Sequence, residues 1–326
     1  MAIRSGLAAQ IGIAAESTWG TYVAPDHWYE FNEEDLALSI ERVESAGLRA
    51  GNRVLRTDRW AAGQKRVEGS VTMEVPTKAF GLIAKHALGA VSITTPSGAT
   101  NARLHAHTLG DPYGLGMTVQ VGRPDTAGTV QPFSYTGAKI SELTLSNSVD
   151  EILLAEIGFV AQNESTSESL ATASYPTGNQ IFNWTQGVIS IAGSTVGVVS
   201  DFEVTINNGL KDDRYFLGAS TMSEPIIADM TSIEGTMTVE FDGLTNYNRF
   251  VSGTEAAVSA TWTAATEIES GFSPYVQVSI DNARFDGATP NVGGPDVLTH
   301  ELSFKAVYDG SNGPITINYQ TDDTAS

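Results

Sequence analysis

The residues best suited to chemistry are five histidines: His27, His86, His105, His107 and His300. His105 and His107 are two residues apart, so a β-strand would place both side chains on one face. Two imidazoles on one face could begin a metal site. No cluster of carboxylates lies near them in the sequence. We therefore expect a surface pair, with no metal and no cofactor.

The motifs of common catalytic and nucleotide-binding sites are missing. The chain contains no cysteine, which excludes disulfides, thiolate-bound zinc and a thiol nucleophile. Neither a Gly-x-Ser-x-Gly elbow nor a Gly-x-x-x-x-Gly-Lys-Ser/Thr phosphate loop occurs. Gly114 and Gly116 enter a predicted strand, whereas a dinucleotide site needs a helix there. We predict that the chain has no catalytic residues and is not an enzyme.

The charge of the chain disfavours stable binding to nucleic acid. The net charge is −20, from 38 acidic and 18 basic residues, and most of such a surface would repel phosphate. This charge indicates either solubility or a surface that must not adhere to a polyanion. The sequence lacks an apolar run of membrane-spanning length and a signal-peptide core, so we expect synthesis in a cytoplasm and no membrane contact.

The elements that would position any site are mainly strands. Apolar residues make up 41% of the 326 residues and charged residues only 17%, a profile that suits β-sheet. Further alternating or apolar segments predict strands at 117–122, 140–146, 152–161, 186–192, 257–263, 275–281, 298–308 and 314–319.

The two halves of the chain match each other. Residues 66–75 align without gaps to residues 232–241 at an offset of 166, and the same offset pairs 36–40 with 202–206. A polar stretch without periodicity separates the halves. We therefore predict two tandem modules with a linker between them, at 1–165, 166–180 and 181–326.

The matching strands each carry a Glu-Gly pair and alternate cleanly. Apolar side chains and the glycine point one way, and glutamates and hydroxyl side chains point the other. The polar side carries Glu68, Ser70, Thr72 and Glu74 in the first copy, and Glu234, Thr236, Thr238 and Glu240 in the second. An ordinary solvated face is the alternative, although such faces usually include Lys and Arg.

A short helix is predicted after each Glu-Gly strand. In the first, Thr77 is the expected N-cap and Gly89 the expected stop, with an apolar face formed by Phe80, Ile83, Ala84, Ala87 and Leu88, beside which His86 would be half-exposed. The second has Leu244, Tyr247 and Val251 on one face and ends at Gly253. The segments 43–65 and 208–231 lack clear periodicity, and long irregular loops in β-domains are usually functional.

Several segments, in this order, resemble the tail tube (major tail) proteins of long-tailed bacteriophages. They are 9–25, which includes Glu-Ser-Thr-Trp-Gly-Thr-Tyr, then 28–31, 42–49, 207–211, 214–218, the second Glu-Gly strand and 294–296. The resemblance spans nearly the whole chain, although each segment alone is a weak motif.

The resemblance implies a non-enzymatic structural protein of the virion tail. Its fold would be mainly β, with two tandem β-sandwich or barrel modules, each flanked by a short helix, that close into a ring-shaped β-barrel on oligomerisation. Rings would stack into a tube, with tape-measure protein and terminator or tip proteins as partners. DNA would pass through without being bound.

These expectations assign roles to particular residues. The lumen would be lined by Ser39, Glu41, Glu68, Ser70, Thr72, Glu74, Glu203, Thr205, Glu234, Thr236, Thr238 and Glu240. Loops 43–65 and 208–231 would join successive rings, with Arg49, Arg53, Arg56 and Arg59 in the first loop.

Two modules per chain favour a trimeric ring with pseudo-six-fold symmetry. The alternative ring is a hexamer in which one half lines the lumen and the other decorates the outside. Two other functions remain open: a monomeric tandem β-sandwich adhesin or decoration protein, and a secreted carbohydrate-active enzyme. The five tryptophans, Trp19, Trp28, Trp60, Trp184 and Trp262, are scattered, whereas a carbohydrate cleft would usually cluster them.

Overall fold

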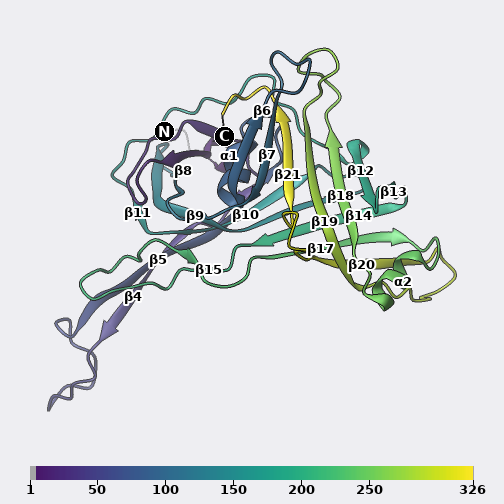
Figure 1. Ribbon diagram of the computed structural model, residues 1–326. Helices are drawn as coiled ribbons and strands as arrows, with labels where there is room; N and C mark the ends of the chain where they lie inside the picture. Colours follow the sequence, from purple (N-terminus) through teal and green to yellow (C-terminus); the bar gives the residue numbers. More distant parts are fainter. Residues whose placement is uncertain (1–4, 326) are drawn as a thin grey trace.

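The computed structural model describes residues 5–325, which form a mainly β protein with two α-helices, α1 (Phe80–Leu88) and α2 (Thr245–Ser252) (Figure 1). Strand pairing throughout the named elements is antiparallel. Two 3₁₀ turns, η1 (Gly6–Ala8) and η2 (Trp184–Gln186), and a short ribbon of β15 (Leu210–Lys211) and β16 (Ile226–Ile227) complete the elements outside the sheets.

The first sheet crosses both halves of the chain. Its order is β4 (Ala37–Glu44), β5 (Trp60–Glu74), β10 (Leu154–Ala161), β9 (Val130–Ser148), β14 (Val199–Asn207), β17 (Ser232–Glu240), β20 (Thr299–Ala306) and the C-terminal part of β19 (Tyr275–Gly287). The short β3 (Glu33–Glu34) also pairs with β5. The halves meet where β9 pairs with β14, from Asp201 opposite Ser148 to Asn207 opposite Glu142.

The second sheet covers one side of the first. Its order is β6 (Gly89–Thr94), β7 (Arg103–Leu109), β21 (Thr316–Thr321), the N-terminal part of β19, β18 (Ala256–Thr263), β12 (Gly187–Ile191) and β13 (Ser194–Thr195). The halves therefore meet here too, because β21 lies between β7 and β19. Aromatic side chains from the two sheets pack together in the core, where Phe202 and Trp262 lie edge to face with their ring centroids 5.9 Å apart.

A third group of strands surrounds the N-terminal part of β9. It comprises β2 (His27–Tyr29), β1 (Gln10–Glu16), β8 (Gly116–Pro124) and β11 (Asn163–Ser165). Residues 166–180 contain no regular element and run along this group, where Gln120 bonds to the backbone of Ser169 and Ala171.

The order of pairing recurs along the chain. In the first half, successive neighbours are β1, β8, β9, β10, β5 and β4; in the second they are β12, β18, β19, β20, β17 and β14. Helix α1 follows β5, and α2 follows β17. The ladders place Leu38 opposite Val67 and Ile206 opposite Ile233. The structural equivalent of Ile206 is therefore Leu38, whereas the ungapped alignment predicts Ile40.

The helices agree with prediction only in part. The predicted apolar face of α1 is buried, and Gly89 ends the helix in the left-handed conformation. The predicted N-cap was wrong: Ala79 takes that position, and the Thr77 hydroxyl donates to Asn179 Oδ1 at 3.2 Å. In α2, Leu244 and Val251 are exposed, and Phe250 packs against the core instead.

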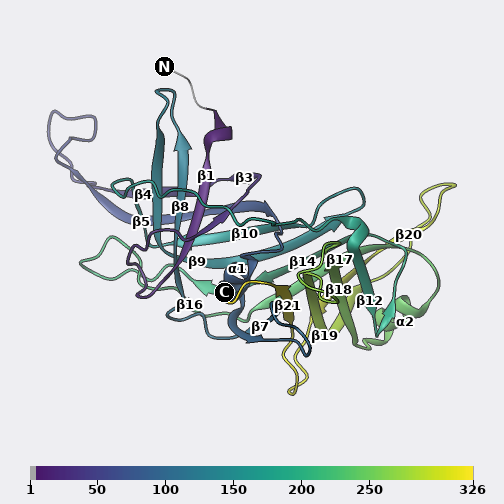
Figure 2. The same cartoon turned by 90° about the horizontal axis from the view of Figure 1, so that it is seen from above.

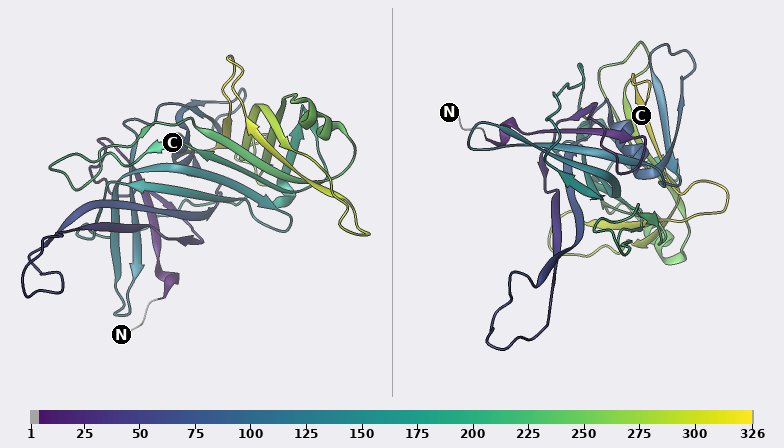
Figure 3. Two further views of the ribbon diagram at one scale, coloured as in Figure 1. Left: turned by 90° about the horizontal axis from the view of Figure 1, so that it is seen from below. Right: turned by 90° about the vertical axis from the view of Figure 1, so that its left-hand side faces the viewer.

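The predicted loop 43–65 is irregular only in its middle. Residues 43–44 and 60–65 belong to β4 and β5, which form a long hairpin arm with the loop 45–59 at its tip. The arm extends away from the body, at the end opposite to α2 (Figure 2), and the view in Figure 3 from the side of the arm shows its tip clear of other segments.

Candidate functional site: an acidic sheet face and an arginine-rich loop

One side of the first sheet faces away from the core and is strongly acidic. We call it the acidic face, and its residues alternate with buried residues in six adjacent strands, β5, β10, β9, β14, β17 and β20. They are Glu68, Ser70, Thr72, Glu74, Glu156, Glu142, Thr144, Ser146, Asp201, Glu203, Thr205, Glu234, Thr236, Thr238, Glu240, Glu301 and Ser303.

The acidic face continues across the junction between the two halves. Thr144 on β9 and Thr205 on β14 are opposite each other, and their hydroxyl oxygens lie 2.8 Å apart. In the adjacent row, Asn207 donates to Glu142 Oε2 at 2.9 Å. The two halves therefore present one surface and not two separate ones.

Few cations offset these carboxylates. Lys305 binds Glu234 at 2.7 Å, and Arg284 binds Asp286 at 2.7 Å at the sheet's far edge. Arg66, near the base of the arm, bridges Glu68 and Asp212, each at 2.7 Å. Most acidic residues of the face have no ion pair among residues 5–325, so the face retains a negative field.

The predicted lumen residues all lie in this first sheet. Ten of the twelve belong to the acidic face as defined above. The other two are on the edge strand β4: Ser39 lies on the same side of the sheet, opposite Arg66 of β5, and Glu41 lies at the register shift of β4. The prediction missed Glu142, Glu156, Asp201 and Glu301. Predicted strands include Glu142, Glu156 and Glu301, and alternation within those strands would have identified their side of the sheet; Asp201 directly precedes the paired segment 202–206.

The glycines of the two Glu-Gly strands share a structural reason. A Cβ on Gly69 would lie 2.7 Å from the carbonyl oxygen of Asp35, and a Cβ on Gly235 would lie 2.6 Å from that of Glu203. Gly69 also has a backbone φ of +150°, which residues other than glycine rarely adopt. In both halves the backbone of an adjacent segment, residues 35–36 beside Gly69 and β14 beside Gly235, therefore approaches too closely for any side chain.

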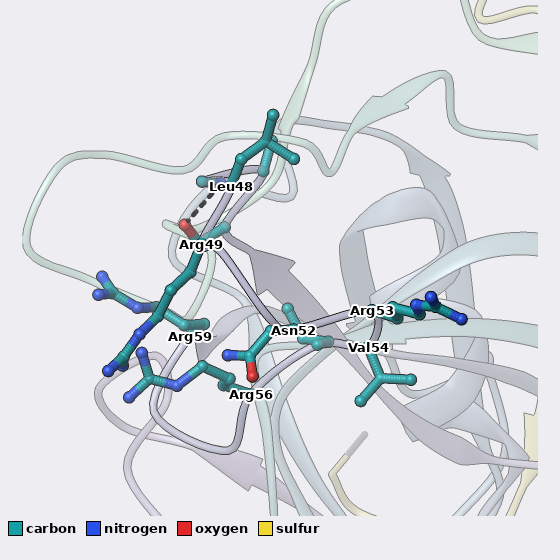
Figure 4. Close-up of a pocket in the computed structure, with 11 residues that line it drawn as sticks. Leu48, Arg49, Asn52, Arg53, Val54, Arg56 and Arg59 are labelled. Atoms are coloured by element: carbon teal, nitrogen blue, oxygen red, sulfur yellow. Dashed lines mark hydrogen bonds between the residues drawn. The ribbon is translucent and has the colours of Figure 1, made fainter.

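The four predicted arginines gather in the loop at the tip of the arm. Arg49, Arg53, Arg56 and Arg59 all line one pocket of the loop, and Figure 4 shows that Arg49, Arg56 and Arg59 extend to one side of the loop and Arg53 to the other. Asp58 binds Arg56 at 2.8 Å and lies 3.9 Å from Arg59.

The apolar residues Leu48 and Val54 in the same loop are exposed. Cationic and apolar side chains therefore occur together at the tip, which suits a protein interface.

The second predicted loop, 208–231, folds back on the chain. Tyr215 donates its hydroxyl to the carbonyl oxygen of Lys65 at 2.8 Å, and the Lys65 amide donates to Ser220 at 2.8 Å. Glu224 from this loop binds the buried Lys139 at 2.8 Å; burial lowers the pKa of Lys139, and Glu224 opposes that shift. This loop braces the base of the arm.

The histidine predictions were wrong. His105 and His107 do not form a surface pair, because both are fully buried beneath α1 on the core side of β7. His86 on α1 is buried as well. Burial lowers the pKa of His86 and of His107 to about 3. Both imidazoles are therefore neutral near pH 7 and pack as part of the protein interior.

Within residues 5–325, no group of three or more histidines and carboxylates is placed to hold a metal ion. The helices of the same residues are too short or too polar to span a bilayer.

The described residues form a mainly β protein with a broad acidic sheet face and a projecting arginine-rich loop. The model of the phage tail tube protein family matches residues 6–306. The chain belongs to this family, as the segments in the sequence predict. A search of curated proteins finds no match. The family consists of structural tube proteins and not of enzymes, so the chain is a virion tail component that assembles into a tube with other tail proteins.

Proposed function

We propose that this chain forms stacked rings whose continuous lumen carries phage DNA. The observation that carries the proposal is the acidic face, which runs unbroken across both halves of the chain. In this arrangement the acidic face lines the lumen together with Ser39 and Glu41 of β4, so that all twelve predicted residues contribute to the lining. Carboxylates near the path of DNA repel its phosphates, so the DNA slides without being held.

The ring is a trimer with pseudo-six-fold symmetry. The repeated order of pairing supports two equivalent modules per chain, at 1–165 and 181–326, and the first sheet includes four strands from each. The alternative hexamer, in which one half decorates the outside, fits less well because the polar side of the sheet does not stop at the junction of β9 and β14.

The loop at the tip of the arm joins one ring to the next. Its arginines suit an acidic surface of a second copy, and guanidinium groups form paired bonds with carboxylates. The protein has no catalytic role and needs no cofactor. Assembly takes place in the host cytoplasm, with tape-measure protein inside the tube and terminator or tip proteins at its ends.

The lumen assignment is tested with introduced cysteines, since the chain has none of its own. Thr72→Cys places a thiol on the acidic face, and Thr263→Cys places one on the exposed side of β18. In assembled tubes, a maleimide linked to a polymer about the size of a small protein domain should modify Thr263→Cys and spare Thr72→Cys. Equal modification of both in tubes would place the acidic face on the outside.

The stacking assignment is tested by charge reversal. Arg53→Glu combined with Arg56→Glu should leave single rings intact and prevent tube growth, as seen by electron microscopy. Arg249→Glu on α2 is the matched control, because it changes an arginine on an element far from the arm. Normal tubes from the double variant would reject this role for the loop. A monomer at every concentration would instead favour the adhesin or decoration protein.

A further inference from the structure

The first sheet contains two sets of four strands, one from each half of the chain: β4, β5, β10 and β9, and β14, β17, β20 and β19. The two sets are alike in detail. Phe159 on β10 lies opposite Gly69, and Phe304 on β20 lies opposite Gly235. Next to each phenylalanine the ladder with the following strand shifts its register, between Gly158 and Phe159 in the first set and between Phe285 and Gly287 in the second. These correspondences match Glu142 on β9 with Gly287 on β19.

The sets differ beyond these matched residues. After Glu142, β9 continues to Ser148 and pairs on its free side with β14. After Gly287, β19 ends, and residues 288–298 have no regular structure. In the part of the chain that the structure describes, the outer side of β4 also has no strand partner. A fold whose sheet edges both remain open is prone to pair with another chain.

We propose that the end of β19 in one copy pairs antiparallel with β4 of a second copy, in the register of β9 with β14. This register places Gly287 opposite Ser39, Ala288 opposite Leu38 and Thr289 opposite Ala37. Residues 288–289 then extend β19 when the copies meet. Pro290 has no N–H, so the new ladder stops there. The inference rests on the proposed ring and names the edges that close it.

The side chains suit this register. Ala288 is buried, and Leu38 packs against the core, so the new pair would extend the core. On the polar side, Thr289 and Ala37 would take the places of Thr144 and Thr205, whose hydroxyls bond across the internal junction. The paired residues are all uncharged, so no charge is buried between the copies.

Disulfide trapping tests the register. Ala37 and Thr289 lie at opposite ends of the first sheet, so a disulfide between them can form only between copies. The double variant Ala37→Cys and Thr289→Cys should give, on oxidation of assembled rings, covalent oligomers of up to three chains on denaturing gels. The matched control, Ala37→Cys with Val292→Cys, carries an exposed thiol out of register and should give at least tenfold less.

Hydrogen exchange on the unmodified chain gives an independent readout. Amides of 37–40 and 286–289 should exchange at least tenfold more slowly in rings than in single chains. Rings that form without this protection, or that cross-link through Ala37→Cys alone, would overturn the inference and leave the proposed function standing. If the unmodified protein forms no rings at all, both the proposed function and this inference fail.

Discussion

At the scale of single residues, the two glycines of the Glu-Gly strands control how closely the sheet can pack. Gly69→Ala and Gly235→Ala would each place a Cβ against the backbone of an adjacent segment, at Asp35 and at Glu203. We expect each to lower the free energy of unfolding by about 2 kcal/mol or more. Gly197→Ala, with open space around it, should change it by less than about 0.5 kcal/mol. Denaturant unfolding measures all three, and a neutral Gly69→Ala would contradict the packing described.

The buried histidines give the fold a defined response to acid. The unfolded chain takes up a proton on each near pH 6.5, whereas the folded chain holds His86 and His107 neutral down to about pH 3. The folded state thus binds fewer protons in this window, so the free energy of unfolding falls as pH falls, by about 1.4 kcal/mol per unit for each histidine.

His107→Leu should therefore reduce the slope of stability against pH between pH 6 and pH 4 by about 1.4 kcal/mol per unit. Chemical unfolding at several pH values measures the slope, and measurement at pH 8 separates the loss of packing from the loss of titration. An unchanged slope would mean that the imidazole of His107 takes up a proton in the folded state as it does in the unfolded chain.

At the scale of elements, the brace formed by loop 208–231 should hold the arm in place. Tyr215→Phe removes the hydrogen bond to Lys65. We expect amides of 60–66 to exchange several-fold faster, with little change in global stability, because the arm lies outside the core. Tyr113→Phe, at an exposed tyrosine, is the control. Unchanged exchange in 60–66 would show that the arm does not depend on this loop.

Elements that alternate were predictable from sequence, and their long-range neighbours were not. The Glu-Gly strands, α1 and the polar side of the sheet follow from period and from capping glycines. His105 and His107 were misplaced because the side of β7 that carries them is covered by α1 and by the C-terminal segment, where Tyr319 and Asp323 contact His105, and alternation within the strand does not reveal this cover. The arm strands were missed in part because both sides of 60–65 are largely exposed, which removes the apolar alternation.

At the scale of the whole molecule, the two proposed contacts between copies should respond oppositely to salt. Ring closure joins backbone edges and brings acidic faces together, so screening should favour it. Stacking by an arginine-rich loop on a chain of net charge −20 is mainly an attraction between opposite charges, which salt weakens.

Raising the salt from about 0.05 to 1 M, which shortens the screening length from above 10 Å to about 3 Å, should therefore release intact rings from tubes. Mass photometry should then show particles of three chains and few single chains. The double variant of Arg53 and Arg56 should show the same particles already at low salt. Tubes that dissociate directly into single chains would mean that stacking and ring closure are one interface, and six chains per ring would return the assignment to a hexamer with one lumen-lining half.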